Sequence, residues 1–227
     1  MPVILSLETS ADVCSVALHK GQQLLGAKVI REPQSHAARL APLIDETMRE
    51  SGHLINDLQA VAVSAGPGSY TGLRIGASTA KGLCYAMELP LITVGTLDIL
   101  AFQGQALNAT GALLCPMIDA RRMEVYCMVT DPELNPVEPV AAKVIEPASF
   151  SELLAHQRML FFGSGAAKCR AVIQHPNALF IDDVIPVASA LGEMAQVKFA
   201  AAKFENLVQF TPYYFKEFAA RKVDPGV

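Results

Sequence analysis

The chain has 227 residues, of which 52% are apolar and only 18% charged, and its mean hydropathy is +0.32. This composition excludes a disordered or low-complexity protein and predicts a globular chain with a substantial core. The formal net charge of −4 has the wrong sign for a protein that neutralises many phosphates by itself, so we expect nucleic acid to be met only through a partner.

The first half of the chain predicts three strands followed by alternating helices and strands. The expected helix over 35–50 carries apolar residues at i+4 spacing, and Pro42 lies inside it. The first two strands and the turn pair Lys20-Gly21 that follows them indicate a β-hairpin, and the third strand extends the same sheet. The predicted elements are strands 3–7, 14–18 and 23–30, helix 35–50, strand 60–64, helix 71–87, strand 89–94 and helix 96–107.

The second half repeats the same order, and an acid again follows its first apolar run: Glu8 in the first half, Asp119 in the second. The order βββαβαβα in each half predicts an α/β fold with two sheet lobes, here assigned to residues 1–108 and 109–227, and a cleft between them. The predicted elements are strands 113–118, 124–130 and 140–145, helix 148–156, strand 159–162, helix 165–174, strand 179–181 and helix 187–204.

A glycine-rich segment, GPGSYTGLRIG at residues 66–76, lies between a predicted strand and a predicted helix. Its spacing fits neither the Walker A loop nor the dinucleotide fingerprint. Its backbone amides suit an anion, which makes Glu8, Ser10, Gly66, Gly68 and Asp119 candidate nucleotide-binding residues. Alternatively, the glycines permit a tight turn and close helix packing, and the two acids are turn residues facing solvent.

The packing interpretation is favoured by small residues at i+4 steps, namely Gly72, Gly76, Ala80 and Cys84. If this row faces outward together with the His36, Leu40 and Ile44 face of helix 35–50, the two helices form an apolar protein–protein interface.

Other chemistry finds little support in the sequence. The five cysteines form no C-x-x-C pair and the histidines no H-E-x-x-H, so we expect no disulfide framework and no metal site. No G-x-S-x-G occurs, and Gly163-Ser164-Gly165 is interpreted as a strand-to-helix turn, so no catalytic residue is assigned. No signal peptide or membrane segment is expected, and a cytoplasmic protein is predicted.

These motifs resemble the TsaB (YeaZ) family of bacterial tRNA threonylcarbamoyladenosine proteins. The glycine segment at 66–76 carries the most specific similarity, and weaker segments accompany it across most of the chain. They are ILSLETS at 4–10, CSVAL at 14–18, the 35–45 stretch, IDAR at 118–121, EVY at 124–126 and PYY at 212–214.

The resemblance implies a two-lobed, actin-like (Hsp70-like ATPase) fold with a more variable second lobe. It also implies a non-catalytic subunit that binds and activates a larger catalytic paralogue, TsaD, with the small P-loop ATPase TsaE, for threonylcarbamoyl transfer to tRNA. The sequence leaves open whether homodimers form when the partner is absent. tRNA would be met only through the complex, and this chain alone would bind no cofactor, so that any ATP and Mg²⁺ would be held at the level of the complex.

In such proteins the dimer is built from the first two helices of the first lobe. The partner-binding residues that this implies are His36, Leu40, Leu43, Ile44, Thr47, Met48, Thr71, Gly72, Leu73, Ile75, Gly76, Ala80 and Cys84. A stand-alone ATP-dependent phosphotransferase that uses Glu8, Asp119 and the glycine loop is the rival hypothesis, and a metal-dependent peptidase is a weaker third. Glu8 stands where actin-like ATPases usually place Asp, which argues against independent ATP hydrolysis.

Overall fold

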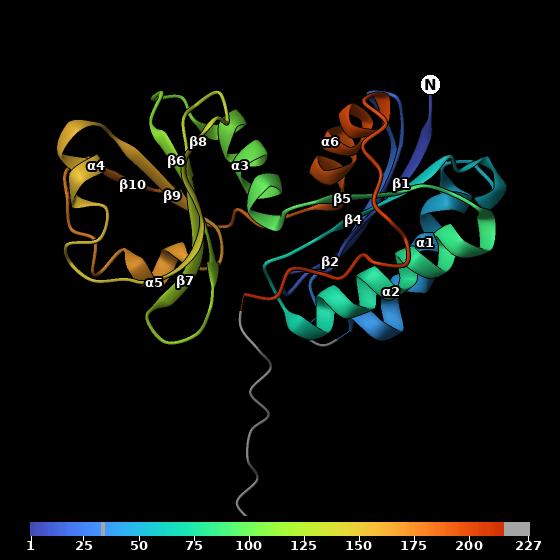
Figure 1. Ribbon diagram of the computed structural model, residues 1–227, viewed down its shortest axis with the longest axis horizontal. Helices are drawn as coiled ribbons and strands as arrows, with labels where there is room; N and C mark the ends of the chain where they lie inside the picture. The colour runs from blue at the N-terminus through green and yellow to red at the C-terminus, as the bar shows by residue number, and fades with distance from the viewer. Residues whose placement is uncertain (33–34, 216–227) are drawn as a thin grey trace, which may run out of the picture.

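The computed structural model describes residues 1–32 and 35–215, in which two five-stranded sheets form the framework of two lobes (Figure 1). The first sheet has the order β3-β2-β1-β4-β5, with β1 (Val3–Glu8), β2 (Cys14–Lys20), β3 (Gln23–Ile30), β4 (Ala60–Ser64) and β5 (Leu91–Val94). The second has the order β10-β9-β6-β7-β8, with β6 (Leu113–Asp119), β7 (Glu124–Thr130), β8 (Pro136–Val144), β9 (Met159–Phe162) and β10 (Ala178–Phe180).

Both sheets are built around one central, almost wholly buried strand. β1 pairs antiparallel with β2 and parallel with β4, and β6 pairs in the same way with β7 and β9. An apolar run buried on both faces is typical of such a central strand. The duplicated βββαβαβα order predicted from the sequence, and with it the α/β two-lobed fold class, is confirmed.

Helices cover the outer face of each sheet. On the first sheet these are α1 (His36–Glu50) and α2 (Tyr70–Met87), whose apolar residues share one core with Leu5, Val16 and Val61. On the second sheet they are α4 (Ser151–His156) and α5 (Ala166–Cys169). A short 3₁₀ turn, η1 (Ile55–Asp57), leads from α1 into β4.

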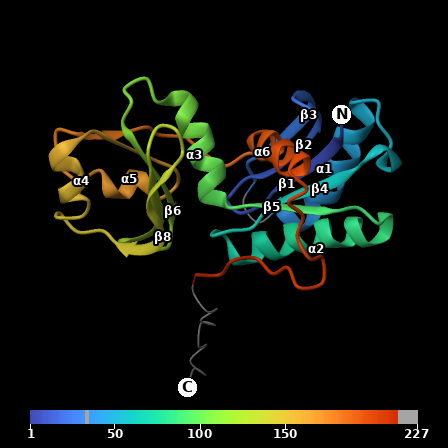
Figure 2. The ribbon, with the colours of Figure 1, turned by 45° about the horizontal axis from the view of Figure 1, so that its top comes forward.

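The two helices between the sheets are exchanged between the halves of the chain. α3 (Thr96–Leu107) follows β5 but packs on β6, where Leu97 and Leu100 meet Leu114 and Phe162. α6 (Ala188–Ala200) follows β10 but packs on β1 and β2 (Figure 2). Each inner helix thus finds apolar partners on the sheet of the other half, across the predicted boundary between residues 1–108 and 109–227.

Several elements of the second half differ in length from the sequence prediction. The helix expected over 165–174 is the single turn α5, since the chain turns back with the amides of Val172 and Ile173 bonded to the Cys169 carbonyl. The strand expected over 140–145 begins earlier, as β8, and the last helix ends at Ala200 rather than at 204.

Beyond α6 the chain returns over the first lobe, where Glu205 forms an isolated bridge with Leu91 at the edge of β5. None of the helices in residues 1–32 and 35–215 combines the length and the apolar character that crossing a bilayer requires.

Candidate functional site

The glycine-rich loop between β4 and α2 lies directly on the segment that follows β1. The Ser69 amide donates to the Ser10 carbonyl (2.7 Å), and the Thr9 hydroxyl donates to the Gly72 carbonyl (2.8 Å). A Cβ atom at Gly68 would overlap the Ser10 carbonyl oxygen, and one at Gly72 would overlap that of Thr9. These glycines therefore permit a close backbone approach within the chain, which supports the packing interpretation of the motif.

The start of α2 is capped by its own residues. The Ser69 side chain accepts a hydrogen bond from the Gly72 amide (3.2 Å), and the Ser69 carbonyl accepts one from the Leu73 amide (2.8 Å). Serine at this position satisfies amide groups that otherwise lack an intrahelical partner. An anion bound at this helix terminus would have to compete with Ser69 for these amides.

Glu8 is fully buried at the end of β1, beneath this loop. Its Oε1 accepts from the Ser10 amide (2.6 Å) and from the Ser64 hydroxyl (3.1 Å), whereas its Oε2 has no partner within the described residues. Burial raises the pKa of the Glu8 carboxyl, and the bonds from Ser10 and Ser64 lower it by less. The expectation of a solvent-facing turn acid is wrong for Glu8.

Asp119, the matching acid of the second half, lies in a different environment. Its side chain is half exposed, forms an ion pair with Lys168 and accepts from the Arg121 amide (2.8 Å). Of the residues proposed for a nucleotide, Glu8 and Ser10 are thus buried under the glycine loop with Gly66 and Gly68 in that loop, while Asp119 is paired at the surface.

The burial of Glu8 predicts how replacing it with glutamine, its isosteric amide, changes the stability of the protein. Because the folded-state pKa is raised, Glu8 keeps its proton more tightly in the folded protein than in the unfolded chain, so its contribution to stability falls as the pH rises from about 4.5 through the folded-state value. We expect Glu8→Gln to raise the melting temperature at pH 7–8 and to remove this part of the pH dependence. Thermal melts of both proteins between pH 4 and 8 check this, and a Glu8→Gln protein that is less stable at pH 8 would contradict it.

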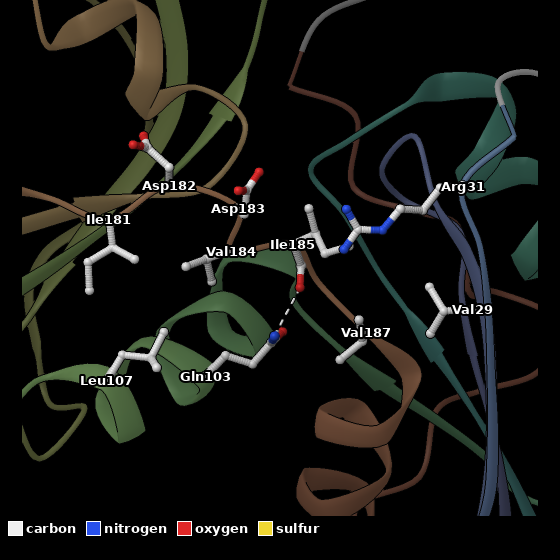
Figure 3. Close-up of a pocket in the computed structure, with 10 residues that line it drawn as sticks. All are labelled: Val29, Arg31, Gln103, Leu107, Ile181, Asp182, Asp183, Val184, Ile185 and Val187. Atoms are coloured by element: carbon white, nitrogen blue, oxygen red, sulfur yellow. Dashed lines mark hydrogen bonds between the residues drawn. The ribbon is translucent and has the colours of Figure 1, made fainter.

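A pocket of about 700 Å³ opens between the lobes (Figure 3). It is lined by the end of β3, by α3 and by the connection from β10 to α6, and none of the proposed nucleotide residues contributes to it. Sequence reasoning missed this pocket because its walls come from three segments that only the exchange of α3 and α6 brings together. The lining residues are Val29, Arg31, Gln103, Leu107, Ile181, Asp182, Asp183, Val184, Ile185 and Val187.

The face of α1 that was expected to meet a partner is buried within the chain itself. It packs against β2 and β3, and the His36 Nε2 lies within hydrogen-bond distance of the carbonyls of Ala11 (3.0 Å) and Val13 (3.1 Å). The buried residues of this face are His36, Leu40, Leu43, Ile44, Thr47 and Met48.

The small-residue row of α2 also faces inward. A Cβ atom at Gly76 would overlap the Thr9 hydroxyl, and Ala80 and Cys84 belong to the first-lobe core. Gly72, Leu73, Gly76, Ala80 and Cys84 are buried, whereas Ile75 is partly exposed and Thr71 is exposed. The side of the two helices available to a partner is therefore the opposite one from that predicted.

That opposite side carries a group of small residues among polar ones. α1 and α2 contact each other, and we call their solvent side the α1/α2 outer face. At Gly82 an added Cβ atom would meet nothing within 4 Å, so nothing in the chain requires glycine there. The spacing of small residues between the apolar positions is the sequence signal that could have found this face. Its small or apolar exposed members are Ala37, Ala38, Ala41, Pro42, Ser78, Gly82, Tyr85 and Ala86, and the exposed polar residues of the two helices are Asp45, Arg49, Glu50, Thr71 and Arg74.

Within the described residues no group of three or more His, Cys, Asp or Glu side chains could hold a metal ion. All five cysteines are buried, and burial raises the pKa of Cys14, Cys84 and Cys169 to about 11, so these thiols stay protonated at neutral pH.

Comparison with known proteins places the chain among relatives of similar length. The family model described as "TsaD: tRNA N6-adenosine threonylcarbamoyltransferase" matches residues 31–226. The "tRNA threonylcarbamoyladenosine biosynthesis protein TsaB" of Escherichia coli (strain K12) is 30% identical, over 98% of this chain and 98% of that protein. The protein of the same name from Haemophilus influenzae is 29% identical, over 98% and 97%.

Solved structures agree with this placement. A crystal structure of a Pseudomonas aeruginosa protein "with similarity to peptidase YEAZ" has a TM-score of 0.82 at 29% identity, covering 95% of this chain and all of that one. The activator of 2-hydroxyisocaproyl-CoA dehydratase from Clostridium difficile has a TM-score of 0.51 at 11% identity, covering 88% and 96%, and shows the shared fold alone. The chain therefore belongs to the TsaB (YeaZ) family, within the broader family that the TsaD model describes.

Proposed function

We propose that this chain is a non-catalytic subunit of the cytoplasmic machinery that makes N6-threonylcarbamoyladenosine in tRNA. It docks a TsaD-like catalytic paralogue on the α1/α2 outer face and activates it, and a TsaE-like P-loop ATPase joins the pair. In the absence of that paralogue the same face pairs two copies of this chain. With a net charge of −4, the chain meets tRNA through the complex.

The observation that carries this proposal is the chemistry of the outer face. A glycine inside a helix destabilises it by roughly 0.5–1 kcal/mol relative to alanine, and Gly82 makes no close contact in the chain that would offset this. Small residues on a helix surface allow another helix backbone to approach closely. Tyr85, which is 81% exposed beside Gly82, supplies the aromatic side chain that interfaces favour at their centre.

A non-catalytic role is supported by the state of the residues that an actin-like enzyme of this chain would use. Glu8 is buried under the glycine loop, the Gly72 amide is bonded to Ser69, and Asp119 is paired with Lys168. A phosphotransferase needs accessible groups to position Mg²⁺ and phosphates. Any nucleotide then belongs to the complex rather than to this chain alone.

The proposal is tested by the affinity of the purified chain for the TsaD-like paralogue of the same organism, measured by calorimetry. Ala41→Glu places a charge on the outer face of α1, where burial against a partner leaves it unpaired, and we expect at least tenfold weaker binding. Ala155→Glu makes the same change at an exposed alanine of α4 in the second lobe and should bind like the unchanged chain. Equal affinities of both variants would contradict the assignment of the face.

A further inference from the structure

The segment from Glu205 to Phe215, here called the strap, runs over the first lobe, along α2, and ends between the lobes (Figures 1 and 2). We infer that the strap is a latch: it fixes the angle between the two lobes by joining the first lobe to the second beside the crossing from β5 to α3.

The strap is firmly attached to the first lobe along its length. The Glu205 amide donates to the Leu91 carbonyl (2.8 Å), and the Thr93 hydroxyl donates to the Glu205 carboxylate (2.6 Å). Farther along, the Lys81 ammonium of α2 donates to the carbonyls of Val208 (3.3 Å) and Phe210 (3.0 Å). The Phe210 ring is buried in the first-lobe core.

The strap then passes the point at which the chain first crosses between the lobes. The Tyr213 amide donates to the Ala65 carbonyl (2.7 Å), and the Gly66 carbonyl accepts from the amide of Thr96, the first residue of α3. Gly66 has a φ of +99°, and a Cβ atom built there would lie 2.7 Å from the Tyr213 carbonyl oxygen. Glycine at this position thus lets the strap lie directly against the start of the crossing.

The end of the strap reaches the second lobe through an aromatic chain. The Phe215 ring lies 5.3 Å from that of Tyr126 on β7 and packs against the core that α3 forms with the second sheet. Tyr213 contacts Phe215 edge-on at 4.5 Å, and Tyr214 lies 4.8 Å from Tyr70 of α2. Ring contacts of this kind are favourable beyond the apolar area that they bury, so loss of the Phe215 ring should loosen the link between the strap and the second lobe.

The inter-lobe pocket provides both the space and a direction for the movement that the latch prevents. Arg31 projects into it from the end of β3, and Asp183 projects from the opposite wall (Figure 3). Within the described residues neither side chain forms a hydrogen bond or an ion pair, and their opposite charges attract across the pocket. Release of the strap should therefore allow the lobes to close over this pocket.

The test measures the separation of the lobes directly. Because all five native cysteines are buried, spin labels attach selectively to cysteines introduced at the exposed Ala27 of β3 and Ala109 beyond α3. We compare the labelled parent with Phe215→Ala, and with Phe204→Ala as a matched control, since the Phe204 ring contacts Phe199 within the first lobe. We expect Phe215→Ala to give a broader distance distribution with a shorter mean, and Phe204→Ala to match the parent.

Two further measurements keep the result decisive. Adding Arg31→Gln to Phe215→Ala should remove the shortening and leave the broadening. Thermal melts show whether Phe215→Ala remains folded. If it does not, Phe215→Leu, which keeps an apolar side chain but removes the ring contacts, is compared with the parent instead. A folded Phe215→Ala or Phe215→Leu protein with the distance distribution of the parent would overturn the inference.

Discussion

Gly72→Ala is expected to destabilise the protein by about 2–3 kcal/mol, whereas Gly82→Ala, in the same helix, is expected to stabilise it by about 0.5–1 kcal/mol. At Gly72 the added methyl group would overlap the Thr9 carbonyl oxygen, and the backbone cannot move away without breaking the bonds between the glycine loop and the 9–10 segment. At Gly82 the methyl group would meet nothing within 4 Å.

The two substitutions are controls for each other. Both replace glycine by alanine inside α2, so the gain in helix propensity is similar and the difference between them reports the close approach at Gly72 alone. Chemical denaturation followed by circular dichroism measures the free energy of unfolding of each variant. If Gly72→Ala were as stable as Gly82→Ala, the packing role assigned to the glycine loop would be wrong.

Much of the fold was predictable because local patterns determine it. The buried run of β1, the hairpin to β2 and the i+4 spacing in 35–50 each specify an element without help from distant residues. The similarity of the two halves then predicts two related lobes. The prediction was less accurate for the second half of the chain, because the short helix α5 depends on turns near Cys169 that carry no strong sequence signal.

The exchange of α3 and α6 was not predictable, because the sequence of a helix shows that it has an apolar face but not which sheet that face covers. Ile99 of α3 packs with the first sheet while Leu97 and Leu100 pack with the second. The same limitation explains why the rows of α1 and α2 that were expected to face outward lie inside the chain. The apolar residues of α1 predict an amphipathic helix equally well whether that side meets the chain's own sheet or a partner, and burial against β2 decides the matter.

This distinction changes which substitutions can test docking. Gly76 lies against Thr9 and Val63, so a bulky residue there tests the stability of the first lobe and not its affinity for a partner. Informative variants must come from positions that the chain leaves open on the α1/α2 outer face.

Gly82→Leu is such a variant, and we expect it to weaken binding to the TsaD-like paralogue about 100-fold. A leucine side chain at the point of closest approach forces the partner backbone outward, and overpacking of this kind costs about 1–3 kcal/mol, where 1.4 kcal/mol corresponds to a factor of ten. The folded chain should be at least as stable as the parent, because leucine is the better helix former by roughly 0.8 kcal/mol and the position is open.

Opposite effects on stability and on binding are what make Gly82→Leu decisive. A variant that loses affinity because it unfolds would show a lower melting temperature, which thermal melts run beside the calorimetry exclude. Ala155→Leu on α4 is the matched control, since it adds the same exposed side chain in the other lobe. If Gly82→Leu binds as tightly as Ala155→Leu, the partner does not lie over Gly82, and the exposed glycine in α2 must then have another explanation.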